Sequence, residues 1–174
     1  MNQALAGWDN FYVIIGSSAA ALTGLQFVVI ALVTEVRTSS SSQTLDAFAT
    51  PTIVHFCVVL MIAAIVTMPG HSTITLTTCL MVLGGAGVIY ALFVTFRARH
   101  QRGYKPVLED WIFHAFLPVV AYAWLFAAGA AIQRWPAGSL YCVAGSALTL
   151  LFVGIHNAWD AAVWMTTRAR RSRR

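Results

Sequence analysis

Charged residues are scarce in this sequence. Only 10% of its 174 residues are Asp, Glu, Lys or Arg, whereas soluble domains carry about 25%. A soluble globule needs polar side chains to cover its surface, and a disordered chain contains few apolar ones, yet 59% of these residues are apolar. The composition therefore excludes an ordinary soluble enzyme and a disordered protein, and it indicates a polytopic membrane protein.

Several motifs are also missing. The three cysteines contain no CxxC pair, which argues against thiol–disulfide exchange. No internal repeat is visible, so nothing in the sequence indicates an inverted-repeat transporter. The zinc-protease motif HExxH and the paired ExxH of di-iron bundles are absent too. Any chemistry must therefore come from a constellation of residues that no named motif describes.

Long apolar runs dominate the rest of the sequence. A membrane-spanning helix needs about 20 mostly apolar residues. Five stretches qualify, namely Phe11–Thr34, Pro51–Thr67, Thr73–Phe96, Trp111–Ile132 and Gly138–Thr166. They lack the alternation of a membrane β-barrel. The sequence therefore predicts an all-α fold, in which residues 1–174 form a single domain of five transmembrane helices.

The basic residues predict how these helices are oriented. Of the 11 Lys and Arg residues, only Arg134 falls on the predicted side of the N-terminus. The others lie after the first or third span, or near the C-terminus, where residues 167–174 form a basic tail. Because cytoplasmic loops carry the excess of Lys and Arg, we expect the N-terminus outside and the C-terminus in the cytoplasm. We expect the tail to contact anionic membrane lipid rather than nucleic acid.

Three of the five prolines predict local features. Pro51 fits the first turn of the second span, where a missing N–H costs little. Pro69 and Gly70 predict a tight turn into the third span. Pro118 cannot donate to the carbonyl of His114, four residues earlier. That carbonyl is then available to a side chain, a water or a ligand, unless the proline only kinks the helix.

Polar side chains gather in the predicted cytoplasmic half of the bundle. The fourth and fifth spans each carry an Asp and a His four residues apart, which places each pair on one helix face. The set consists of Gln26, His55, Asp110, His114, His156, Asn157 and Asp160. Ionisable groups are costly at membrane depth, so these residues are functional candidates.

Three histidines with carboxylates nearby predict a metal site that faces the cytosol. Imidazole and carboxylate together suit Zn, Fe, Cu or Mn, and two facing histidines also suit a haem. The candidate ligands are His55, His114, His156 and Asp160. The residues expected to orient these ligands, or to relay protons, are Asp110, Gln26 and Asn157.

Two other interpretations use the same residues differently. Histidine exchanges protons near neutral pH, so the set also fits a proton or small-ion channel or transporter built as a homo-oligomer. Alternatively, the protein is a membrane scaffold, in which His156 and Asn157 form a hydrogen-bonded packing pair. A catalytic role is not assigned to any residue.

Small residues recur at every fourth position of three spans. These stripes are Gly16, Ala20 and Gly24 in the first span, Ala123, Ala127 and Ala131 in the fourth, and Gly138, Cys142 and Ser146 in the fifth. Such stripes let helix backbones approach closely in lipid. We expect some of them to serve the five-helix core and others to join copies in a homo-oligomer.

The segment FYVIIGSSAAALTGLQFVVIAL, at residues 11–32, resembles the start of small multi-pass bacterial inner-membrane proteins without assigned activity. The likeness covers the first span only and gives no residue a role. It implies a multi-pass location in the bacterial inner membrane.

Overall fold

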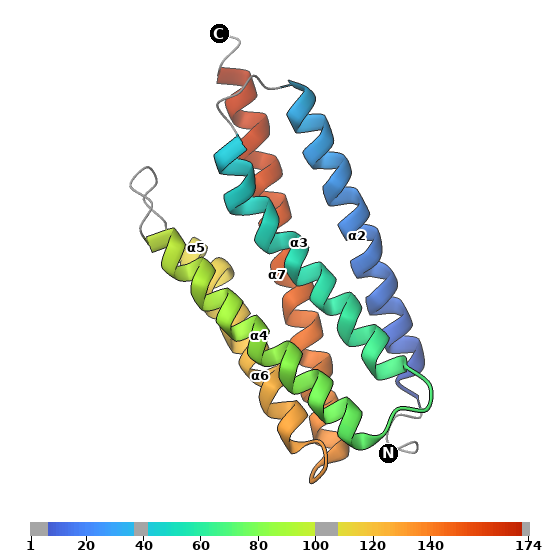
Figure 1. The fold of residues 1–174 in the computed structure, drawn as a ribbon. Helices are drawn as coiled ribbons and strands as arrows, with labels where there is room; N and C mark the ends of the chain where they lie inside the picture. The colour runs from blue at the N-terminus through green and yellow to red at the C-terminus, as the bar shows by residue number, and fades with distance from the viewer. Residues whose placement is uncertain (1–6, 37–41, 100–107, 172–174) are drawn as a thin grey trace.

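A computed structural model describes residues 7–36, 42–99 and 108–171. Side chains at 32–36, 42–49, 98, 108, 110 and 164–171 lie outside this description. The described ranges contain helices and turns but no strand, which confirms the all-α prediction. The long helices lie side by side in one elongated bundle, and α7 ends at the opposite end from the start of α2 (Figure 1).

The first two helices form an antiparallel pair. α2 spans Asp9–Val36, and α3 spans Ser42–Thr67 and packs along it. Pro51 lies in the first turn of the apolar stretch Thr50–Thr67, as predicted, but inside the longer helix α3, nine residues after its start, so its missing N–H is not at a helix end. A proline removes one backbone donor, and a membrane helix tolerates that loss where neighbouring groups compensate. The apolar stretch therefore begins later than the helix that contains it.

The connection from α3 to α4 is the predicted tight turn. Gly70 has a φ of +71°, in the left-handed region that glycine enters without steric cost. Ser72 then caps α4, which spans Thr73–Arg99, because its Oγ accepts a 3.0 Å hydrogen bond from the backbone N–H of Thr75.

The fourth span is interrupted by a π-helical turn. Its elements are α5 (Leu108–Trp111), the π-turn η1 (Ile112–Phe116) and α6 (Leu117–Ala131). The N–H of Leu117 donates to the carbonyl of Ile112, five residues back rather than four. Pro118 explains this register, since its missing N–H already breaks the α-helical ladder at this point. The proline therefore produces a widened turn around His114.

The last helix, α7, spans Pro136–Arg171 and starts with a proline at its first position, where the missing N–H costs nothing. Its helical backbone continues five residues past the predicted end of the fifth span. The start of the predicted basic tail at 167–174 is thus helical as far as Arg171.

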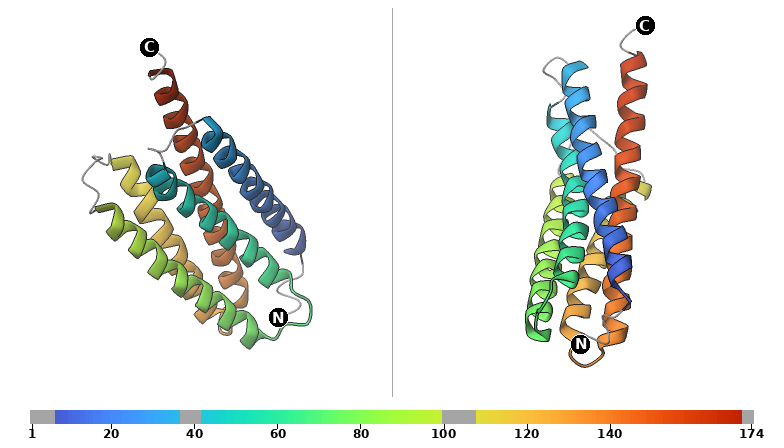
Figure 2. Two further views of the ribbon diagram at one scale, coloured as in Figure 1. Left: turned by 45° about the horizontal axis from the view of Figure 1, so that its top comes forward. Right: turned by 90° about the vertical axis from the view of Figure 1, so that its right-hand side faces the viewer.

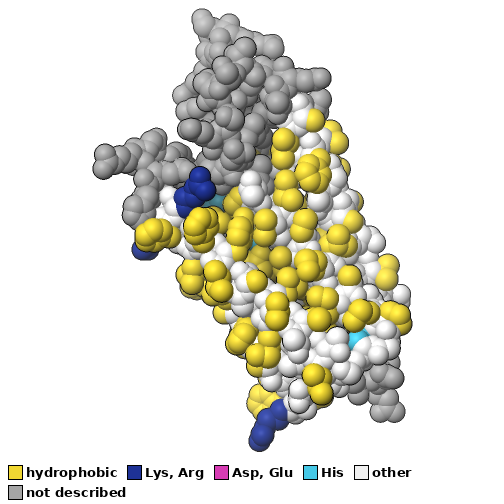
Figure 3. All heavy atoms as spheres, in the orientation of Figure 1, with side chains coloured by type: hydrophobic (Ala, Val, Ile, Leu, Met, Phe, Trp, Pro, Cys, Tyr) yellow, Lys and Arg dark blue, Asp and Glu magenta, His cyan; other side chains and the backbone are white. Residues whose placement is uncertain are grey.

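Among the described residues, five stretches are long and apolar enough to cross a membrane, in agreement with the predicted number of spans. They are Asp9–Ala31, Thr50–Thr67, Thr73–Arg97, Ile112–Ala131 and Pro136–Val163. On the face that Figure 3 shows, apolar side chains cover the middle, and the described basic side chains lie toward the two ends. This surface is the reverse of a soluble one and fits a lipid environment.

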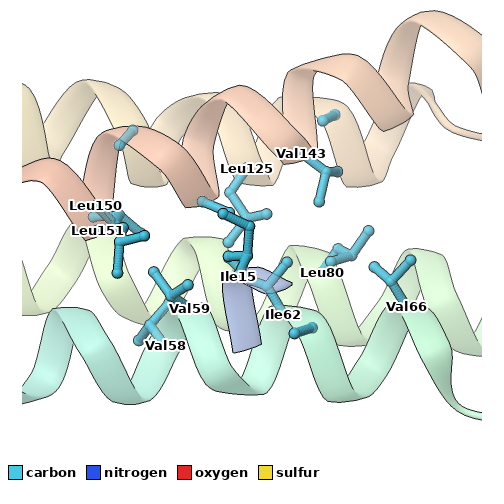
Figure 4. Close-up of a cluster of buried hydrophobic side chains, with 14 of the residues drawn as sticks. Ile15, Val58, Val59, Ile62, Val66, Leu80, Leu125, Val143, Leu150 and Leu151 are labelled. Atoms are coloured by element: carbon cyan, nitrogen blue, oxygen red, sulfur yellow. The ribbon is translucent and has the colours of Figure 1, made fainter. Parts of the chain in front are cut away.

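Helix α7 contacts both α3 and α6, while α2 packs on α3, and α4 packs on α6 (Figures 1 and 2). Apolar side chains from all five spans meet in the core. Figure 4 labels Ile15, Val58, Val59, Ile62, Val66, Leu80, Leu125, Val143, Leu150 and Leu151. Val58 and Val59 of α3 lie at the level of Leu150 and Leu151 of α7, as expected of antiparallel neighbours.

Candidate functional site

A hydrogen bond joins α3 to α6 inside the bundle. Nδ1 of His55 lies 2.9 Å from the hydroxyl oxygen of Tyr122, and both residues are buried. The two ring centroids are 5.7 Å apart. Tyr122 is not among the residues predicted for the site. A tyrosine in the middle of a span was itself a signal, because a buried phenol usually finds a hydrogen-bond partner.

Glycine on α4 makes room for this tyrosine. A side chain at Gly87 would overlap the ring of Tyr122, so only glycine fits at this position. Gly154 of α7 has the same role for Phe56, the neighbour of His55, whose ring occupies the space of a Cβ at position 154. Two glycines therefore set the positions of the aromatic rings around the His55–Tyr122 hydrogen bond.

His114 belongs to the same region. It lies in η1, and its imidazole is close enough to His55 for the two rings to interact electrostatically. The π-turn also affects its neighbour Phe113. In an α-helix the carbonyl of Phe113 would accept from the N–H of Leu117, but that N–H donates to Ile112 instead. In a π-helix the same carbonyl would accept from Pro118, which has no N–H. This carbonyl therefore lacks both of its helical donors.

His156 lies at the basic end, the name we give to the end of the bundle where α4 and α7 terminate. Its Nε2 is 3.4 Å from an Oδ of Asp160 and 3.7 Å from an Oε of Glu109. Its ring stacks on Phe113, with centroids 3.6 Å apart and planes at 17°. The side chain of His156 is 20% exposed and that of Glu109 is 65% exposed. The two carboxylates are therefore open to water, whereas Nε2 of His156 is itself buried.

The predicted pair of His156 and Asp160 thus lies together, and Glu109 joins it. The acid predicted for this place was the neighbouring Asp110. Asp110 lies in α5, and its side chain falls outside the described residues. Glu109 and Asp110 are adjacent acids at the start of the span, and the sequence gives no rule for which of them turns toward α7.

Gln26 and Asn157 are both buried, as we expect of polar residues chosen for the bundle interior. Asn157 is only 3% exposed, yet neither atom of its side-chain amide has a hydrogen-bond partner among the residues that the structure describes. The hydrogen-bonded packing pair with His156 is therefore not formed. His156 instead faces Phe113 and the carboxylates.

The three histidines do not converge on one point. His55 lies beside Tyr122 and interacts electrostatically with His114, whereas His156 lies with the carboxylates at the basic end. Within residues 7–36, 42–99 and 108–171, no group of three or more His, Cys, Asp or Glu side chains is placed to hold a metal ion. The metal and haem assignments stay predictions, because the site also includes the undescribed side chain of Asp110.

The small-residue stripes divide between the core and the surface. Gly16 is buried against Ala63, where an added Cβ would lie 2.9 Å from the Cβ of Ala63. In the other positions of the first two stripes, Ala131 is half-buried and the rest are exposed on a single chain, namely Ala20, Gly24, Ala123 and Ala127. In the stripe of the fifth span, Ser146 is buried, whereas Gly138 and Cys142 are exposed. The exposed members face either lipid or a second copy. The homo-oligomer and the lipid contacts of the tail stay predictions.

No family model, curated protein or solved structure matches this chain.

Proposed function

We propose that this chain is a multi-pass protein of the bacterial inner membrane that moves protons through the interior of its helix bundle. Its N-terminus is outside and its C-terminus is in the cytoplasm, in agreement with the excess of basic residues at the basic end. The exposed carboxylates of Asp160 and Glu109 then face the cytosol, beside His156.

The buried hydrogen bond between His55 and Tyr122 carries this proposal. It places two groups that both donate and accept protons between α3 and α6, with the imidazole of His114 nearby. Burying such titratable groups at membrane depth costs free energy, so their presence there marks a functional candidate. A metal site would require several donors around one centre, and no three His, Cys, Asp or Glu side chains of the described residues are placed in that way. Paired donors and acceptors are what a proton relay requires.

Histidine performs the relay through its two ring nitrogens. A neutral imidazole accepts a proton on one nitrogen and becomes an imidazolium, then releases the proton from the other nitrogen. The net result is the passage of one proton and a change of tautomer. In His55 the Tyr122 hydroxyl donates to Nδ1 when the ring carries its proton on Nε2, and it accepts from Nδ1 in the other tautomer. The hydrogen bond between His55 and Tyr122 can therefore form both before and after the proton has passed.

The test is proton flux into liposomes that contain the purified protein and a pH-sensitive dye. A pH step is applied, with a potassium ionophore to dissipate the membrane potential. We expect the parent to acidify the lumen faster than empty liposomes, and we expect His55→Gln to lose at least about tenfold in rate, which corresponds to roughly 1.4 kcal/mol. His71→Gln is the matched control, since His71 lies in the turn between α3 and α4.

Two results would contradict the proposal. One is a parent protein whose flux does not exceed that of empty liposomes. The other is elemental analysis of the protein, purified without chelator or affinity tag, that finds Zn, Fe, Cu or Mn near one atom per chain. The second result would restore the metal site of the sequence analysis, with His114→Ala and His156→Ala as the variants that should lose the metal.

A further inference from the structure

Helix α7 carries two buried polar side chains on one face. Asn157 is 3% exposed and Ser146 is 0% exposed. The two are eleven residues apart, which is close to three full turns, so their side chains leave the helix in nearly the same direction. Neither the amide of Asn157 nor the hydroxyl of Ser146 has a hydrogen-bond partner in the described part of the chain.

The packing of α7 on α3 shows which level of the bundle Asn157 occupies. Gly154 lies against Phe56, since a Cβ on Gly154 would overlap that ring. Because the two helices are antiparallel, one residue back along α3 corresponds to one residue forward along α7. His55 therefore lies at about the level of the residue that follows Gly154. Figure 4 shows the same register farther along, where Val59 lies at the level of Leu151. Asn157 is therefore about half a turn nearer the basic end than His55.

The packing of α7 on α6 gives the corresponding level of Tyr122. Phe113 stacks on His156, and these two helices are antiparallel as well. Tyr122 follows Phe113 by nine residues, which places its backbone near position 147 of α7. The hydrogen bond between His55 and Tyr122 thus falls between the levels of Ser146 and Asn157.

These groups are spaced along the interior between α3, α6 and α7, with buried apolar side chains such as Val143 and Leu150 between them, and we call the set the polar column. It consists of Asn157, the His55–Tyr122 pair and Ser146. Ser139 is also buried and continues the same face of α7 toward the opposite end. From Ser139 to Asn157 the helix rises by about 27 Å, at 1.5 Å for each residue. That length is close to the thickness of the hydrocarbon core, about 30 Å.

The chemistry of the unpartnered atoms identifies the occupant. The amide of Asn157 offers a donor and an acceptor, and so does the hydroxyl of Ser146. A bare cation would bind only the oxygens, and an anion would bind only the donors. Water both donates and accepts, and it is the usual partner of buried polar groups that the protein itself leaves unsatisfied.

We propose that water fills this polar column and links the His55–Tyr122 pair to both ends of the bundle. The inference deepens the proposed function, on which its second test rests, because a chain of water molecules gives protons a route past the apolar side chains of the core. The polar column also extends this route into the opposite half of the bundle, where the titratable residues at the basic end do not reach.

The first test detects the water directly and does not depend on transport. Solid-state NMR of the protein in lipid bilayers measures magnetisation transfer from water to individual side chains. We expect rapid transfer to the side-chain amide of Asn157, assigned by its disappearance in Asn157→Leu. We expect little transfer to the backbone amides of Gly84 and Gly129, where α4 and α6 are in close contact. Equal, slow transfer at all three positions would overturn the inference.

The second test uses proton flux in liposomes. Ser146→Ala removes the hydroxyl and adds no bulk, and we expect it to lower the flux at least about tenfold. Ser18→Ala is its matched control, because the Ser18 hydroxyl already donates to the carbonyl of Ile14 in its own helix. A parent that conducts protons with Ser146→Ala unchanged would overturn the column as the route. A parent that does not conduct would contradict the proposed function alone, and the NMR experiment would still decide whether the column holds water.

Discussion

Two interior regions of this bundle are built on opposite principles. Between α4 and α6, glycines bring the backbones together: a Cβ on Gly84 would lie 2.5 Å from the backbone nitrogen of Phe126, and one on Gly129 would lie 3.0 Å from that of Met81. Between α3, α6 and α7, the helices instead enclose polar side chains, such as Asn157 and Ser146. Close contact excludes water in the first region, and unpartnered polar groups require it in the second.

Tyr122 belongs to both regions and shows how they depend on each other. Its ring lies in the space that Gly87 leaves on α4, while its hydroxyl reaches across to Nδ1 of His55 on α3. The ring fixes the direction of the hydroxyl, because dense packing leaves it no other rotamer. The apolar contact between α4 and α6 therefore positions a polar group that acts elsewhere. Each prediction below alters one side of this relationship.

The largest effect is expected from Gly87→Ala. The added methyl group would overlap the ring of Tyr122, and overpacking of this kind costs about 1–3 kcal/mol. We expect the melting temperature in detergent to fall and proton flux to be lost, because the hydroxyl moves away from His55. Gly85→Ala is the control, since its Cβ would meet the Phe126 ring at an ordinary 3.6 Å. Equal stability of the two variants would show that the packing of α4 on α6 at Gly87 does not determine where Tyr122 lies.

A smaller loss of stability is expected from Tyr122→Phe, which keeps the ring and removes the hydroxyl. The α4–α6 contact is then unchanged, but Nδ1 of His55 loses its partner, at a cost of about 1–2 kcal/mol for a buried polar group. Proton flux should fall at least about tenfold while the fold remains intact. Tyr141→Phe, at an exposed tyrosine, is the control. Full flux in Tyr122→Phe would show that the hydroxyl serves packing only.

His156→Gln changes the exposed end of the site. The contacts of His156 with Asp160 and Glu109 are long and partly solvated, so their loss should change stability by less than about 1 kcal/mol. Flux should still fall, by about threefold, because water at this end can replace the imidazole in part. The measurement is the initial rate after a pH step. A loss as large as that of His55→Gln would place the critical step at the basic end.

The smallest effect is expected from Gly24→Ala. Nothing lies within 4 Å of a Cβ at this position, so the monomer should change by no more than about 1 kcal/mol, in the stabilising direction that helix propensity favours. Cross-linking in membranes tests the remaining question. If the exposed stripe with Gly24 joins two copies, the bulkier Gly24→Leu should reduce the yield of cross-linked oligomer. An unchanged yield would remove this stripe from the interface.

Much of the fold was predictable from residue order, and the site only in part. The apolar runs predicted the number of spans, and Gly70 predicted the turn, since both depend on neighbouring residues alone. The pair of His156 and Asp160 also followed from spacing on one helix. Tyr122 and Glu109 were missed because their partners lie on other helices, and no periodicity within one span reveals which face meets which neighbour.

The sequence by itself determined that this chain consists of apolar helices, how many there are, and where the ionisable residues occur. These properties follow from hydropathy and the 1.5 Å rise of an α-helix, which act within each segment. Tertiary structure alone decided that the three histidines do not gather around one centre and that His55 pairs with a tyrosine. It also brought the buried polar groups of α3, α6 and α7 into one column. Those outcomes depend on how far the helices slide and rotate against each other, and the glycines that set these positions act only through their neighbours.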